Sequence, residues 1–250
     1  QNPPDGAIID YYLKNNSPNE VTLQIFDSAG NFVRKYSSND KPYKMPEVNV
    51  PLYWIRPQQI LSAEAGEHRF IWDMHYDPVN DDISFPMTAV YKNTPPLSTS
   101  PWVIPGTYTV QLKLNGKIYK QSLIIVMDPR VKTPVTALRH QLDLSLQCYR
   151  GQKACMQLSK EITDYRDSLK KQTASADIEK FDTAAALLQN NSAKGSLSFA
   201  KLNGDFAAVT AVLQDADVMP TQRTDDAVKQ LQNNLQTMED QWKQLKQKMH

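Results

Sequence analysis

The sequence predicts two domains of different class, an antiparallel β-sandwich followed by an antiparallel bundle of three to four helices. Of the 16 prolines in the 250-residue chain, 15 lie at or before Pro134. Before that point apolar and polar residues alternate, and after it apolar residues recur every three or four positions, which are the periods of strands and helices. We therefore expect an all-β domain with long proline-rich loops over residues 1–131 and an all-α domain over residues 132–250.

The first strands are predicted at "AIIDYYLK" and within "VTLQIFDSAGNFVRKY". In the second segment alternate apolar residues share one face, and "DSAG" is a loop of hairpin length in which Gly30 can adopt a positive φ. The strand that begins at Gly66, "GEHRFIWD", alternates in the same way and places Trp72 on its apolar face. We expect Trp72 to be buried in the sandwich core.

The clearest hairpin follows Gly106, where "GTYTVQLKL" places Tyr108 on the inward face and is followed by Asn115 and Gly116. Asn-Gly is the strongest short-range signal for a two-residue hairpin turn. Six or seven short strands of this kind predict an antiparallel sandwich. Counting back across the turn predicts three facing pairs, Leu112 with Tyr119, Tyr108 with Leu123, and Val110 with the polar Gln121.

Four helices are expected in the second part of the chain. Thr133 is predicted as the N-cap of the first helix and Pro134 as its first helical residue. The last helix has the cleanest apolar stripe, and it includes Trp242. Because such stripes would be exposed on isolated helices, they predict a bundle with Trp242 in its core.

Composition excludes some classes of partner. The chain has 28 basic and 27 acidic residues and a net charge of +1. Nucleic-acid binding needs a concentrated basic face, so no nucleic-acid partner is expected. No apolar run approaches the roughly 20 residues that span a bilayer. The chain begins with Gln1 rather than Met, which predicts a piece of a longer product.

The two cysteines, Cys148 and Cys155, lie seven residues apart in predicted helix. That spacing separates their Cα atoms by roughly 10 Å, too far for a disulfide. We therefore expect two free thiols. A helix break at Gly151 would bring them within reach of each other.

No arrangement of residues predicts catalysis or a cofactor. The sequence has no nucleophile elbow, Walker A or dinucleotide-binding motif, and its four histidines form no metal-binding motif. The adjacent acids Asp225 and Asp226 fall in the first turn of the last helix, where they stabilise the helix dipole. The oxygen-rich segment with Asp77, Asn80, Asp81 and Asp82 is a weak calcium candidate, because the same residues favour turns.

Aromatic residues in two long loops, residues 37–65 and 74–105, are the strongest functional signal. Long ordered loops are uncommon unless they have a role or a docking partner. Exposed rings on a sandwich can stack on sugars, whereas rings flanked by proline and aliphatic residues pack on a neighbouring surface. The residues concerned are Tyr53, Trp54, Tyr91 and Trp102.

Several segments carry a resemblance to known proteins. "VTLQIFDSAGNFVRKY", "AGEHRFIWD" and "PGTYTVQLKLNGK" resemble the Ig-like domain named after the flagellar hook-capping protein. In addition, "NPPDGAIIDYYL", "PLYWIRP", "PWVIPGTYTV", "MDPRVKTP" and "DADVMPT" are similar to the C-terminal region of large bacterial proteins. Those proteins carry an N-terminal BNR/sortilin-type β-propeller and are labelled glycosyl hydrolases.

The resemblance covers nearly the whole chain and implies an Ig-like sandwich plus a helical bundle, exported to the periplasm, the cell surface or the medium. It also implies that any sialidase-like chemistry belongs to the propeller, and no Asp-box (S-x-D-x-G-x-T-W) occurs in this chain. The chain is thus expected to be a non-catalytic accessory region that supports or docks on the propeller of its own polypeptide. The alternative is a carbohydrate-binding module that uses the loop aromatics.

Overall fold

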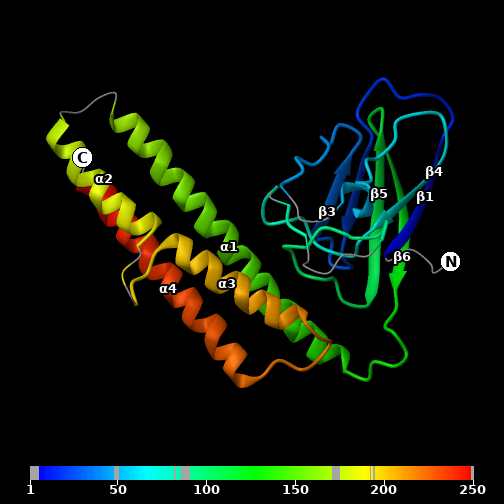
Figure 1. The fold of residues 1–250 in the computed structure, drawn as a ribbon. Coiled ribbons are helices and arrows are strands. Elements are labelled where there is room, and N and C mark those ends of the chain that lie inside the picture. The colour runs from blue at the N-terminus through cyan, green and yellow to red at the C-terminus, as the bar shows by residue number, and fades with distance from the viewer. Residues whose placement is uncertain are drawn as a thin grey trace. The chain divides into compact units, whose positions relative to one another are not determined.

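The computed structural model contains two antiparallel sheets and four helices, a mixed α+β composition (Figure 1). Its residues divide into two compact units, Gln1–Lys132 and Thr133–His250. All strands lie in the first unit and all four α-helices lie in the second. The structure describes residues 6–47, 51–81, 83–85, 91–170, 175–191, 193 and 195–248, without the side chains of 175–178.

The first unit contains a two-stranded sheet and a four-stranded sheet. The smaller sheet pairs β1 (Ala7–Leu13) with β4 (Gly66–Trp72). The larger sheet contains, in spatial order, β3 (Phe32–Ser37), β2 (Thr22–Phe26), β5 (Gly106–Leu114) and β6 (Lys117–Ile125). Every strand pair in these two sheets is antiparallel, as the alternating sequence pattern predicts.

Residues from both sheets share the apolar core of this unit. Trp72 of β4 is fully buried beside Ile25 of β2 and Tyr108 of β5. The Trp72 and Tyr108 rings meet edge to face with centroids 5.7 Å apart. The Tyr108 hydroxyl donates a hydrogen bond of 2.6 Å to the carbonyl of Ile104. The predicted burial of Trp72 and Tyr108 is confirmed.

The β5–β6 hairpin has the register that its turn predicts. Asn115 and Gly116 both have positive φ, 50° and 77°, as a type I′ turn requires. The exception in the apolar pattern, Gln121, is exposed on the edge strand β6, so its polar side chain is not desolvated. The three predicted pairs are present, Leu112 with Tyr119, Tyr108 with Leu123, and Val110 with Gln121.

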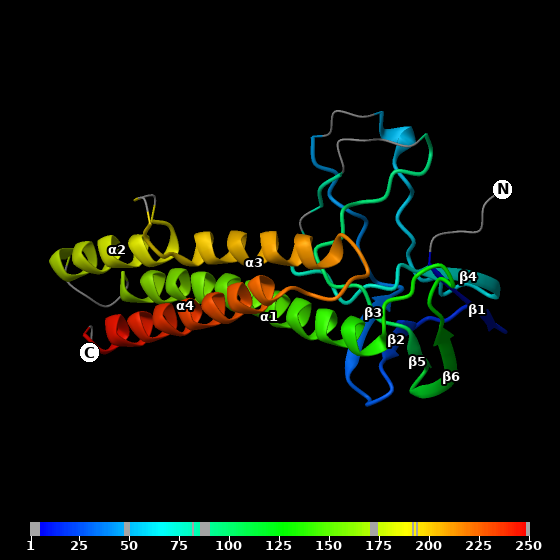
Figure 2. The same cartoon turned by 90° about the horizontal axis from the view of Figure 1, so that it is seen from below.

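The second unit consists of α1 (Val135–Leu169), α2 (Ser175–Gln189), α3 (Phe199–Gln214) and α4 (Gln222–Gln247). In Figures 1 and 2, α2 and α3 follow one another along the same side of α1 and α4. All four helices contribute to one apolar core, in which Trp242 is 1% exposed. The predicted burial of Trp242 is confirmed.

Helix α1 continues through Gly151 without a break. Cys148 and Cys155 are therefore free thiols, as the helical spacing predicts, and both are buried. Burial raises the pKa of Cys148 to about 11 and that of Cys155 to about 12. The glycine is present because α1 and α3 approach closely: a Cβ at Gly151 would lie 2.5 Å from the ring of Phe206.

The predicted cap of α1 is wrong by one residue. Pro134 has φ −61° and ψ 145°, which is extended rather than helical backbone, so it occupies the N-cap position itself. Its carbonyl accepts the first helical bonds, from the amides of Ala137 and Leu138. The Thr133 hydroxyl does not cap the helix but donates to the carbonyl of Asp217, in the segment before α4. The Thr133 hydroxyl therefore bonds to a residue far away in the chain instead of to the nearby backbone of α1.

Candidate functional site

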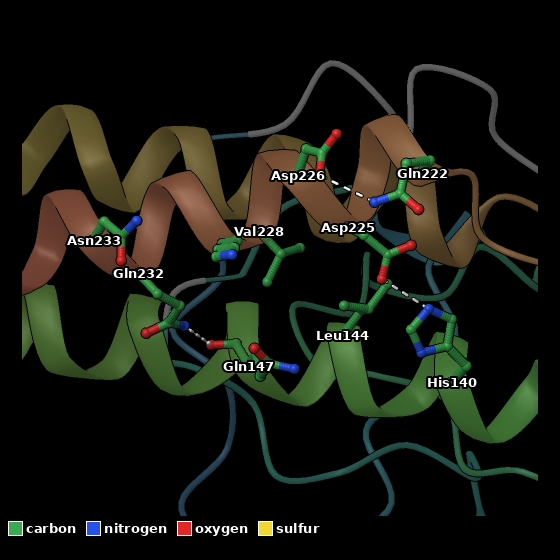
Figure 3. A pocket seen from close by; sticks show the side chains of 10 residues that line it. His140, Leu144, Gln147, Gln222, Asp225, Asp226, Val228, Gln232 and Asn233 are labelled. Atoms are coloured by element: carbon green, nitrogen blue, oxygen red, sulfur yellow. Dashed lines mark hydrogen bonds and ion pairs between the residues drawn. The ribbon is translucent and has the colours of Figure 1, made fainter.

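A pocket of about 440 Å³ lies between α1 and α4 in the helical unit (Figure 3). At one end His140 Nε2 of α1 lies 2.8 Å from Asp225 Oδ1 of α4. At the other end Gln232 Nε2 donates a hydrogen bond of 3.1 Å to the backbone carbonyl of Gln147. The pocket is therefore crossed at both ends by polar links between the same two helices.

The chemistry available in this pocket is limited. A histidine oriented by a carboxylate can act as a general base, but nucleophilic catalysis also needs a hydroxyl or thiol beside it. The lining residues include no serine, threonine, tyrosine or cysteine. Asp225 lies in the first turn of α4, as predicted, whereas Asp226 lies beyond that turn and accepts a hydrogen bond from Gln222. The geometry fits a set of polar contacts that holds α1 and α4 in register.

Three of the four predicted loop aromatics come together in the first unit. Tyr53 and Trp54 belong to the short 3₁₀ helix η1 (Leu52–Trp54), and Tyr91 comes from the second long loop. Their ring centroids lie 5.8–6.5 Å apart with interplanar angles of 77–89°. Rings packed edge to face stabilise one another but offer no coplanar row on which successive sugar rings could stack.

Backbone pairing holds the two loops together at this cluster. The Arg56 amide donates to the Thr94 carbonyl over 2.8 Å, and the Thr94 amide donates to the Trp54 carbonyl over 3.0 Å. Arg56 Nε also donates to Asn93 Oδ1, and Thr94 is buried. Figure 2 shows both loops extending to the same end of this unit, with η1 at the tip. At the tip the two loops therefore form one hydrogen-bonded structure rather than two independent segments.

The tip exposes apolar groups to solvent. Tyr53 is 66% exposed and Tyr91 is 58% exposed, and Leu52 beside them is equally open. We call these three residues the loop-tip patch. Trp54 is half-buried, and its indole N–H has no acceptor within the described residues.

Trp102, the fourth predicted aromatic, is not part of the ring cluster formed by Tyr53, Trp54 and Tyr91. It lies on the ring of His75, with centroids 3.8 Å apart and an interplanar angle of 42°. The two residues also form an isolated antiparallel bridge. Trp102 is half-exposed, so its ring covers the buried imidazole of His75.

The acidic segment does not assemble a metal site in the described part of the chain. Asp77 Oδ1 accepts a hydrogen bond from the Lys35 amide and lies 3.7 Å from Arg34 Nε, so this carboxylate is engaged by β3. Asp81 is exposed, and Asp82 lies outside the described residues. No group of three or more histidine, cysteine or acidic side chains is arranged for a metal among the residues that the structure describes.

Sequence reasoning missed a partly buried polar cluster at the base of the second loop. Arg34 donates from Nη1 to the carbonyl of Tyr76 and lies over the ring of Tyr36, which in turn donates to Asp73 Oδ1. Burial raises the pKa of Tyr36 and lowers that of His75 in the same region. The signal was the placement of Arg34 and Tyr36 two residues apart on one face of a strand. The cluster ties residues 73–77 to β3.

Comparison with protein-family models, curated proteins and solved structures finds no match to this chain. None of the described helices is long and apolar enough to cross a membrane. Two sites remain on which a function can rest, the loop-tip patch, which exposes apolar side chains, and the α1–α4 pocket, which is lined mainly by polar ones.

Proposed function

We propose that this chain is a non-catalytic accessory region of an exported protein, with an Ig-like sandwich and a helical bundle, which docks through its loop-tip patch on another domain of the same polypeptide. One observation carries the proposal: two long loops are fastened to each other by backbone hydrogen bonds and present Tyr53 and Tyr91 to solvent. An exposed apolar surface with a polar surround is typical of an interaction site. The resemblance to propeller-bearing proteins suggests the propeller as the docking partner.

Further features support the finer fold assignment. The Tyr108 hydroxyl bonds to the backbone carbonyl four residues upstream, which is the geometry of the tyrosine corner in Ig-type sandwiches. The fully buried Trp72 packs on that tyrosine between the two sheets. In the helical unit, one shared apolar core receives residues from all four helices, as a bundle requires.

Docking predicts a difference in amide hydrogen exchange between this chain alone and its full-length parent. Residues 51–56 and 91–94 should exchange more slowly in the parent, because an apolar partner would cover the patch and shield its backbone bonds. Replacing Tyr53 and Tyr91 together by serine should remove that protection. Tyr12→Ser is the matched control, since Tyr12 is 69% exposed on β1 and outside the patch. Equal exchange in both proteins would refute docking at this patch.

The purified chain is expected to hydrolyse no glycoside. Glycosidases position two carboxyl groups roughly 5–10 Å apart across the scissile bond. Here Asp225 is paired with His140 and Asp226 with Gln222. The measurement is turnover of sialosides and a broad glycoside panel by this chain and by its parent. Turnover by the purified chain that is lost in Asp225→Asn, or in Asp81→Asn, would overturn the accessory role.

The carbohydrate-binding alternative is tested in the same preparation by titration against a glycan panel. Sugar-dependent quenching of tryptophan fluorescence that disappears in Trp102→Ala would favour it. Binding that disappears in the Tyr53→Ser, Tyr91→Ser variant would assign the loop-tip patch to sugar rather than to a protein domain. The perpendicular packing of the patch rings leads us to expect neither result.

A further inference from the structure

Strand β6 lies at one edge of the four-stranded sheet. Its outer edge is long, carries apolar residues and pairs with no other strand among the described residues. It is the last strand of the order β3-β2-β5-β6 and runs for nine residues, from Lys117 to Ile125. Ile118, Tyr119 and Ile124 on this strand are all more than half exposed, and so is Val126 just after it. Proteins usually shorten or cover such edges because the open backbone groups recruit another strand.

The hairpin turn determines which residues present their backbone groups to the open edge. In a two-residue hairpin the pair that closes the turn, Leu114 and Lys117, is a hydrogen-bonded pair, and such pairs alternate along an antiparallel ladder. The odd-numbered residues of β6 therefore direct their amide and carbonyl groups towards β5. The even-numbered residues from Ile118 to Ile124 direct theirs to the open edge.

The sequence of β6 is complementary to itself in one antiparallel register. A two-fold axis at Gln121, the midpoint of the strand, lets all nine residues pair and brings the open even-numbered residues of the two copies opposite one another. No lysine then faces a lysine. The facing pairs are Ile118 with Ile124, Tyr119 with Leu123, Lys120 with Ser122, and Lys117 with Ile125.

The neighbouring registers are less favourable. An axis at Lys120 opposes two lysines directly, which destabilises a cross-strand pair. An axis at Ser122 shifts the ladder past Ile125, where the strand ends, and leaves Lys117 without a strand partner. The midpoint register is the one that uses the whole edge and opposes no like charges.

We propose that β6 pairs antiparallel with β6 of a second copy of this chain, with Gln121 on the two-fold axis, so that the two four-stranded sheets become one continuous sheet. The partner is a second copy because, in this register, Ile118 faces Ile124, Tyr119 faces Leu123, no lysine faces a lysine and the open backbone groups of the two strands meet. This dimer is independent of the docking proposed for the loop-tip patch, since β6 and the patch belong to different parts of the unit.

A charge change at Ser122 tests the register. Ser122 is exposed and faces Thr109 of β5, so its replacement does not disturb the core. Across the proposed interface it faces Lys120 of the other copy, twice. Ser122→Lys should therefore raise the dimer dissociation constant by roughly tenfold, and Ser122→Glu should lower it, because directly opposite charges on paired strands repel or attract. Sedimentation equilibrium measures both, and circular dichroism verifies that each variant is folded.

Disulfide trapping tests the axis. Residues directly opposite at a non-hydrogen-bonded site have Cα atoms about 4.5 Å apart, within reach of a disulfide. Gln121→Cys should form a covalent dimer under mild oxidation. Lys117→Cys is the control, because its two copies would lie roughly 27 Å apart in the same dimer at about 3.4 Å per residue. The native cysteines contribute no background in the folded protein, since both are buried.

The expected set of results is a reversible dimer, weakened by Ser122→Lys, strengthened by Ser122→Glu and trapped by Gln121→Cys but not by Lys117→Cys. A chain that stays monomeric at all concentrations and gives no trapped dimer would overturn the proposal. A dimer that is indifferent to both Ser122 variants would place its interface elsewhere and would overturn it equally.

Discussion

Trp242→Ala is expected to lower the free energy of unfolding of the helical unit by about 3–5 kcal/mol, the usual cost of truncating a buried tryptophan. The indole of α4 packs against Tyr165 of α1 and Phe181 of α2, with ring centroids 5.6 and 6.2 Å away. Its Nε1–H donates to Glu161 Oε1, which also accepts from Lys246. Removal of the ring leaves a cavity among three helices and frees that carboxylate from one of its two donors.

The measurement is denaturant unfolding followed by far-UV circular dichroism, which reports mainly on the helices. Leu187→Ala is the matched control in the same unit, because Leu187 of α2 is half-exposed and its truncation should change stability by no more than about 0.5 kcal/mol. Trp242→Phe should give a smaller loss than alanine, since it retains most of the ring packing. Equal stability of Trp242→Ala and Leu187→Ala would contradict the position of Trp242 in the helical core.

Gly151→Ala is expected to destabilise the same unit by about 1–3 kcal/mol, the range for overpacking a well-packed core. Alanine is the better helix former by about 1 kcal/mol, so propensity alone predicts the opposite sign. The new methyl group would lie 2.5–2.7 Å from three ring carbons of Phe206. That ring is fully buried in the helical core, so moving it aside disturbs the packing around it.

Gly204 of α3 provides the control for this experiment. It is exposed, and a Cβ added there would have no atom within 4 Å. Gly204→Ala should therefore stabilise the helical unit by about 0.5–1 kcal/mol through helix propensity alone. The decisive observation is the opposite sign of the two changes. If both substitutions stabilise the protein, α1 and α3 do not approach as closely as the structure indicates.

The elements themselves are predictable from the sequence, because each depends on residues close together in the chain. Asn115 and Gly116 determine a turn, and the turn determines the register of β5 and β6 residue by residue. The burial of Trp72 and Trp242 follows from their positions on apolar faces whose period identifies a strand and a helix. The presence and order of the four helices likewise follow from their apolar stripes.

The candidate site was predictable only in part. The long loops and their four aromatic residues stand out in the sequence, but nothing local indicates that Tyr53, Trp54 and Tyr91 form one cluster while Trp102 lies on His75. Their grouping depends on the pairing of residues 54–56 with Thr94, almost forty positions later. Such contacts arise from the path of the loops over the sheets, which alternation and turn signals do not encode.

The distance along the chain between the interacting residues separates what the sequence predicts from what only the tertiary structure decides. By itself the sequence determined the class of each half, the strands and helices and one hairpin register, all through short-range conformational preferences. Only the tertiary structure decided that Gly151 continues a helix rather than breaking it, because the reason for the glycine is the ring of Phe206 on another helix. It likewise decided that Thr133 bonds to Asp217 instead of capping α1, and that Arg34 lies over the ring of Tyr36, which bonds to the exposed Asp73. In each case the partner lies far away in the chain, and packing brings it into contact.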